Sequence, residues 1–240
     1  MATQQYTISY GRDRANAIYT DAITRMFGLV ALGVVTTAAA IWIGDLVGIG
    51  EVIFGFGWIG MLASIAVIFG TLIGASRAVQ SGNLALGTGL YLAFTAFEGL
   101  FLSPILIAFT AKSIGVAFLL TGGLFVAMSL IGLTTKRDLS RLGPMLMFGL
   151  IGMIVISLIN VLLIQSSGLF LLINLLLLPL FLALTVWETR QMKQLAQQAA
   201  MRGDDRAASQ VAVMGSIGLY LNVLNTFLII LNLLGFASGD

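Results

Sequence analysis

Seven apolar stretches divide this chain of 240 residues, and most are long enough to cross a bilayer. They are residues 27–44, 52–74, 84–109, 113–135, 143–164, 168–187 and 211–235. A helix needs about 20 apolar residues to span roughly 30 Å of hydrocarbon, and it satisfies all of its backbone polar groups internally. With 59% hydrophobic and 9% charged residues, the composition excludes an ordinary soluble domain. The sequence therefore predicts an all-α integral membrane protein with seven transmembrane helices.

Two residue types are absent, and their absence excludes several kinds of chemistry. The chain has no cysteine and no histidine, so it has no disulfide, thiol nucleophile, imidazole base or imidazole metal ligand. Every aspartate lies in a predicted tail or loop, which excludes the paired membrane aspartates of an intramembrane aspartyl protease. We therefore expect no enzyme activity and no cofactor, apart from a calcium ion as permeant or regulator.

The basic residues predict how the chain is oriented. Residues 1–26 are polar and lack the pattern of a signal peptide, so we expect a cytoplasmic N-terminal segment followed by one membrane domain over 27–236. With that start, the cytoplasmic side holds eleven of the twelve Lys and Arg residues, and Lys112 alone lies outside. The C-terminus should then be periplasmic or external. Because the basic residues are spread over short loops, we expect a lipid bilayer as partner and no nucleic acid.

The last apolar stretch carries small and polar residues on one face. At about 100° per residue these positions fall within an arc of roughly 120° on an ideal helix. They are Gly215, Gly218, Asn222, Asn225, Thr226 and Asn232. Lipid cannot satisfy carboxamides, whereas neighbouring helices can. The pattern predicts that this helix lies inside a bundle, with the asparagines bonding to neighbouring helices.

The two last helices are predicted to form a hairpin. Gly203 followed by Asp204 is typical of a helix end followed by a helix start. Glu188 and Asn222 lie on either side of this turn at similar distances from it, so they should reach similar heights and face each other. This pair is the leading candidate site.

Each candidate residue also has a structural interpretation. Glu98 lies near the middle of the third apolar stretch, where a carboxyl group must be protonated, paired or next to a wet cavity. Glu188 could instead extend to the interface beside Arg190, and Asn222 could serve only to join helices. Arg77 could be a topological charge unless it approaches Glu188. Because oxygen ligands alone are available, the candidates for a calcium or proton site are Glu188, Asn222 and Glu98, and the sequence assigns no metal site.

Four motifs carry a family resemblance that covers about residues 20–236. They are TTKRDLSRLGPML (134–146), EGLFLSPI (98–105), VWETRQMK (186–193) and LYLNVLNTFLIILNLLG (219–235). In this order over seven spans they resemble the Bax inhibitor-1 family, in its bacterial YccA-like branch. The resemblance implies a central C-terminal helix surrounded by the other six, and a pH-sensitive calcium leak. In eukaryotic relatives it implies suppression of cell death.

The resemblance also implies site residues. The aspartate pair that gates the pore in the family matches Glu188 and Asn222, and a family arginine approximately matches Arg77. One of the two carboxylates is therefore replaced by an amide, so this chain departs from the family pattern of two acids that share a proton. The first hypothesis is a passive calcium leak channel, or a pH- or calcium-sensing homeostasis protein, in a bacterial inner membrane. The alternative is a non-conducting interaction protein that modulates a membrane protease, a quality-control complex or stress and cell-death machinery.

Overall fold

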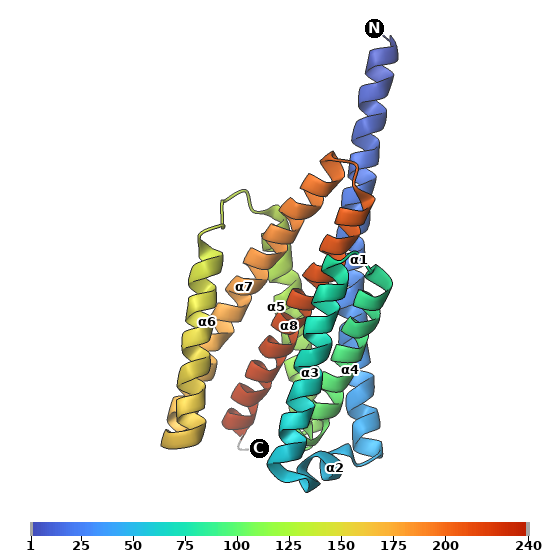
Figure 1. The fold of residues 1–240 in the computed structure, drawn as a ribbon. Helices are drawn as coiled ribbons and strands as arrows, with labels where there is room; N and C mark the ends of the chain where they lie inside the picture. Colours follow the sequence, from blue (N-terminus) through green and yellow to red (C-terminus); the bar gives the residue numbers. More distant parts are fainter. Residues whose placement is uncertain (1, 239–240) are drawn as a thin grey trace. The chain divides into compact units, whose positions relative to one another are not determined.

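A computed structural model describes residues 2–238, and every regular element among them is a helix (Figure 1). In chain order these are α1 (Ala2–Leu46), α2 (Ile49–Gly55), α3 (Gly57–Gln80), α4 (Leu84–Leu106), α5 (Ala111–Thr134), α6 (Leu142–Ile159), the π-helix η1 (Asn160–Ile164), α7 (Ser167–Met201) and α8 (Asp205–Ser238). Seven helical segments within residues 2–238 are long and apolar enough to span a membrane. The predicted fold class is therefore confirmed.

The chain divides into two compact units. Unit 1 comprises Met1–Leu106 with Met192–Tyr220, and unit 2 comprises Ile107–Gln191 with Leu221–Asp240. Helices α7 and α8 thus contribute one part to each unit. The central position of the last helix stays a prediction.

Two helices differ from the apolar stretches that predicted them. Helix α1 begins at Ala2, far before the apolar residues 27–44. Its polar part is supported by an ion pair between Arg25 Nε and Asp21, at 2.8 Å and one turn apart. The second apolar stretch, 52–74, is not one helix, because Gly57 adopts a left-handed conformation (φ 58°) that separates α2 from α3.

Unit 1 is packed around three aromatic rings. The ring of Tyr220 meets those of Tyr91 and Phe94 edge to face, with centroids 5.9 and 5.7 Å apart. The Tyr220 hydroxyl lies 2.6 Å from Thr37 Oγ1, which joins α8 to α1. Gly33 allows this close approach, since a methyl group there would overlap the Tyr91 hydroxyl. The first part of α8 is therefore fixed against α1 and α4.

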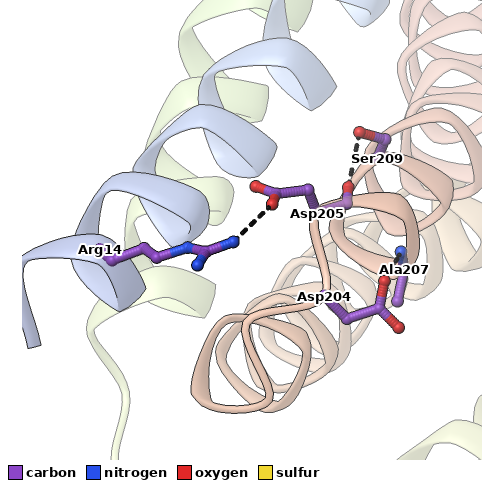
Figure 2. Close-up of polar contacts among 5 residues, drawn as sticks. All are labelled: Arg14, Asp204, Asp205, Ala207 and Ser209. Atoms are coloured by element: carbon purple, nitrogen blue, oxygen red, sulfur yellow. Dashed lines mark hydrogen bonds and ion pairs between the residues drawn. The ribbon is translucent and has the colours of Figure 1, made fainter. Parts of the chain in front are cut away.

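The turn between α7 and α8 has the predicted caps. Gly203 is left-handed (φ 67°), and the Asp204 N–H donates to the Ala199 carbonyl at 3.0 Å, which is the bond that closes a Schellman motif. Asp204 Oδ1 then accepts from the Ala207 N–H at 2.9 Å and caps α8. Figure 2 shows this cap and the neighbouring ion pair between Arg14 and Asp205. The turn reverses the chain and belongs to unit 1.

Unit 2 joins α5, α6 and η1 to the remaining parts of α7 and α8. A methyl group at Gly132 would lie 2.7 Å from the Val186 carbonyl oxygen and 2.8 Å from Thr189 Cβ, so this glycine lets α5 and α7 pack closely. Phe181, Leu184 and Ile229 form a buried apolar cluster between α7 and α8. These contacts hold the two helices that carry the candidate site.

Candidate functional site

Glu188 and Asn222 form a direct hydrogen bond within unit 2. The Asn222 Nδ2 atom donates to Glu188 Oε2 at 2.8 Å, so α8 is joined to α7 through their side chains. Asn222 is 6% exposed, and Glu188 is partly buried. The structure thus brings together the two residues whose distances from the turn predict similar heights. Their role as a gate stays a prediction.

The chemistry of this contact differs from that of two carboxylic acids. An ionised Glu188 accepts hydrogen bonds only, and the amide NH₂ of Asn222 can donate one. A protonated Glu188 can still accept through its carbonyl oxygen, and its hydroxyl can donate to an amide oxygen. Because the amide serves both states, the pair does not need to share a proton in order to stay together.

Several buried polar atoms of unit 2 have no protein partner. Among the described residues, Thr189 Oγ1, Arg190 Nε and Ser129 Oγ are buried without a hydrogen bond. Thr189 and Arg190 directly follow Glu188 on α7, and Thr189 is fully buried. Buried polar atoms are normally satisfied by protein or by ordered water. Their lack of protein partners favours access of water to this part of unit 2.

The charge of Arg190 acts on Asp138, in the loop between α5 and α6. The Ser140 N–H donates to Asp138 Oδ1 at 2.9 Å. This bond, the Ser140 hydroxyl and then the positive charges of Arg141 and Arg190 hold the pKa of Asp138 below its usual value of 3.8. Among the described ion pairs, none joins Arg190 to Glu188. Two residues apart on a helix, the two side chains do not share a face.

The other two sequence candidates belong to unit 1. Arg77 is exposed near the end of α3. Glu98 is partly buried in α4, and no hydrogen bond or ion pair joins it to any side chain that the structure describes. Its carboxyl group lies within electrostatic range of the Tyr220 hydroxyl. Glu188 belongs to unit 2, so the place of Arg77 and Glu98 at the site stays a prediction.

The described residues supply few ligands for a metal ion. No group of three or more Asp or Glu side chains within them could hold one. Calcium takes six to eight oxygen ligands, several of them usually carboxylates. Glu188 with the Asn222 amide could offer a small part of that set, and water would have to supply most of the rest.

Asn225 behaves differently from the prediction. Asn225 Nδ2 donates to the Leu221 carbonyl of its own helix at 2.8 Å, and Asn174 Nδ2 donates in the same way to the Phe170 carbonyl at 2.9 Å. The prediction that Asn225 bonds a neighbouring helix is therefore wrong. Instead, Asn160, Asn174, Asn225 and Asn232 line one cavity of unit 2. Sequence reasoning missed this cavity, although the polar face of the last stretch was a signal for it.

Comparison with known proteins places the chain among bacterial membrane proteins. The family described as "Inhibitor of apoptosis-promoting Bax1" matches residues 20–239. The chain is 32% identical to the inner membrane protein YbhL of Escherichia coli, over 89% of this chain and 90% of that protein. It is also 32% identical to an uncharacterized protein of Borreliella burgdorferi, over 91% and 93% of the two chains. Both relatives are matched over nearly their whole length.

Proposed function

Because the chain belongs to the Bax inhibitor-1 family, we propose that it is a passive cation leak of a bacterial inner membrane, with calcium as its permeant ion. The contact between Glu188 and Asn222 is its gate, on the cytoplasmic side. It catalyses no reaction. The hydrogen bond that joins α7 to α8 is the observation that carries this proposal.

The contact suits a gate because a cation can compete for it. The Asn222 NH₂ group and a calcium ion both bind to lone pairs of the same carboxylate. An ion that reaches Glu188 can therefore replace the amide and release α8 from α7. The unpartnered polar atoms of Thr189, Arg190 and Ser129 support a wet environment in which such an ion keeps part of its water shell.

The replacement of one acid by an amide predicts a shallower pH dependence than two acids would give. Glu188 is the single ionisable member of the contact, and the amide can stay bonded to it in either protonation state. Two carboxylates in this position would have to share a proton and would titrate in coupled steps. The wild-type leak should therefore follow at most the single titration of Glu188, and it should depend on pH less steeply than a variant with two acids.

The test is calcium flux into proteoliposomes that contain a calcium-sensitive dye, measured from pH 5 to 8. Asn222→Asp should make flux steeply pH-dependent, because it restores an acidic pair. Adding Glu188→Gln to that variant should remove the steepness that Asn222→Asp added, since one ionisable group then remains. Asn16→Asp is the matched control, because Asn16 is exposed on α1 and the same chemical change there should leave the profile unchanged.

Two outcomes would contradict the proposal. Identical pH profiles for the wild type and Asn222→Asp would show that the contact does not gate. A folded protein without calcium flux at any pH would favour the alternative, a non-conducting protein that acts on a partner in the membrane.

A further inference from the structure

A second candidate site lies in unit 2, apart from the contact between Glu188 and Asn222. It is a cavity of about 230 Å³ between α6, η1, α7 and α8. Four asparagines line it, namely Asn160, Asn174, Asn225 and Asn232. Neither Glu188 nor Asn222 is among its lining residues. The cavity therefore needs an explanation of its own.

Two of the four asparagines, Asn174 and Asn225, have an amide oxygen without a described donor. Asn174 and Asn225 each use their NH₂ group on a carbonyl of their own helix, at 2.9 and 2.8 Å. No described residue donates to either Oδ1 atom, and each NH₂ group keeps a second N–H. Asn174 is 4% exposed, so its acceptor is held inside the protein. A ligand that satisfies these oxygens must donate hydrogen bonds.

The remaining lining makes a charged ligand unfavourable. None of the residues that line the cavity is charged, and aliphatic and aromatic side chains such as Ile173, Phe181 and Ile229 form much of its wall. An ion there would lose hydration without meeting an opposite charge. Small-molecule sites commonly combine apolar walls with a few placed polar groups. The lining therefore favours an uncharged molecule with an apolar body.

Two residues that line the cavity are exposed on spanning segments, where lipid would cover them. Val161 and Phe170 belong to its lining and are 63% and 40% exposed. Both lie in segments long and apolar enough to span a membrane. A ligand can therefore enter from the bilayer. The π-helical turn η1 contributes Asn160 and Val161 to the lining, and such turns are frequent at functional sites.

We propose that this cavity binds an uncharged amphiphile from the bilayer whose hydroxyl group donates to the Asn174 and Asn225 oxygens. An engineered apolar cavity of about 150 Å³ binds benzene, so this cavity has room for an aromatic or isoprenoid alcohol head. The ligand class follows from the two amide oxygens, the absence of charge among the lining residues and the exposed lining residues on spanning segments. It does not depend on the proposed leak.

The test compares two probes that differ by one hydroxyl group, 4-hexylphenol and hexylbenzene, in tritiated form. Binding to the whole protein in phosphatidylethanolamine nanodiscs is measured against empty nanodiscs. We expect saturable binding of 4-hexylphenol about tenfold tighter than that of hexylbenzene, because a site with unpaired acceptors rejects the analogue without the donor.

Substitutions then locate the acceptors. Asn174→Leu and Asn225→Leu change the size of the side chain little and remove its amide. Each variant should reduce the preference for the phenol, and the double variant should abolish it. Thr121→Val is the matched control, since it removes a buried polar atom of unit 2 that has no partner among the described residues and does not line the cavity. Thermal unfolding of each variant checks that it is folded.

Three results would overturn the proposal. They are equal affinity for the two probes, a preference for the phenol that survives in the folded double variant, and tighter binding of 4-hexylbenzylammonium than of the phenol. The last would assign the cavity to organic cations. Calcium flux enters none of these measurements, so failure of this proposal and failure of the proposed leak are separate outcomes.

Discussion

Glu98 places a carboxyl group inside a spanning helix without a described hydrogen-bond or ion-pair partner. Such a group is best accommodated when it is neutral. Glu98→Gln has nearly the same shape and cannot ionise, so we expect the free energy of unfolding to change by at most about 1 kcal/mol. If Glu98 has a functional role in the leak, calcium flux should fall while stability is kept.

The control for this change is Glu188→Gln, which alters a carboxyl group that accepts a hydrogen bond. Urea unfolding in detergent micelles and flux in proteoliposomes give the two measurements. Unchanged stability together with unchanged flux in Glu98→Gln would remove Glu98 from the candidate site.

Asp138 offers a titration outside the membrane-spanning helices. The Ser140 N–H and hydroxyl, followed by Arg141 and Arg190, hold its pKa below 3.8. A lowered folded-state pKa contributes stability above the unfolded pKa, and this contribution is lost as pH falls through the lowered value. Carbon-13 NMR of the Asp138 carboxyl group should therefore show a midpoint below 3.8.

Ser140→Ala tests the cause of that shift. It removes the hydroxyl but keeps the backbone N–H, so the midpoint should rise only part of the way toward the usual value. A midpoint at or above 3.8 in the wild type would contradict the described loop geometry.

For single residues, the sequence predicted the contact between Glu188 and Asn222 and missed the cavity lined by asparagines. Glu188 and Asn222 could be paired because the turn at Gly203 is recognisable and because helix geometry fixes heights along antiparallel helices. The cavity could not be predicted, because an asparagine in an apolar helix can bond to its own backbone or to a neighbour. Only the packed structure shows that Asn174 and Asn225 take the first option.

Among the helices, the packing of α5 on α7 depends on one glycine. A methyl group at Gly132 would meet the Val186 carbonyl oxygen at 2.7 Å and Thr189 Cβ at 2.8 Å, and neither can move without shifting α7. Gly132→Ala should therefore cost about 1 to 3 kcal/mol of stability. Because Glu188 lies between these two positions on α7, the variant should also change the pH profile of flux.

Gly123→Ala is the matched control on the same helix. A methyl group there meets nothing within 4 Å, so stability should stay the same or rise slightly. Equal unfolding midpoints for Gly123→Ala and Gly132→Ala in urea would show that α5 and α7 do not approach as described.

The helix boundaries show why local patterns give only part of an element. The caps of α5 and α8 follow from Thr110 and Asp204. Each of these side chains accepts a hydrogen bond from the backbone N–H of the residue three positions further along the chain. By contrast, nothing in the apolar stretch 52–74 singles out Gly57 from its other glycines as the one that interrupts the helix. That choice depends on how the short α2 packs against α3 and α4.

For the molecule as a whole, the distribution of basic residues predicts the orientation. Eleven of the twelve Lys and Arg residues lie on one side of the seven predicted spans. A reporter active only in the cytoplasm should therefore be silent when fused after Asp240. The same reporter inserted after Arg202, in the turn between α7 and α8, should be active. Activity of the first fusion in correctly inserted protein would mean an even number of spans.

The number of spanning segments was predictable, whereas their assembly was not. Lipid requires long apolar helices, so seven such stretches predict seven helices regardless of packing. In water, an apolar stripe also reveals which face of a helix is buried. In lipid, most spanning helices are apolar on both faces, so this signal is weak. The division of α7 and α8 between two units also leaves no simple trace in the sequence.

Burial is distributed very unevenly among the spanning segments, and this has a consequence for how the sequence can change over generations. Only 6% of the most apolar window of Leu142–Ile164 is buried, against 50% in Asp205–Ala237. Lipid accepts one aliphatic side chain as readily as another, so neutral drift should run fast through the first segment. In Asp205–Ala237, a new side chain must fit the side chains packed around it. A library of variants should therefore recover few tolerated substitutions in this segment.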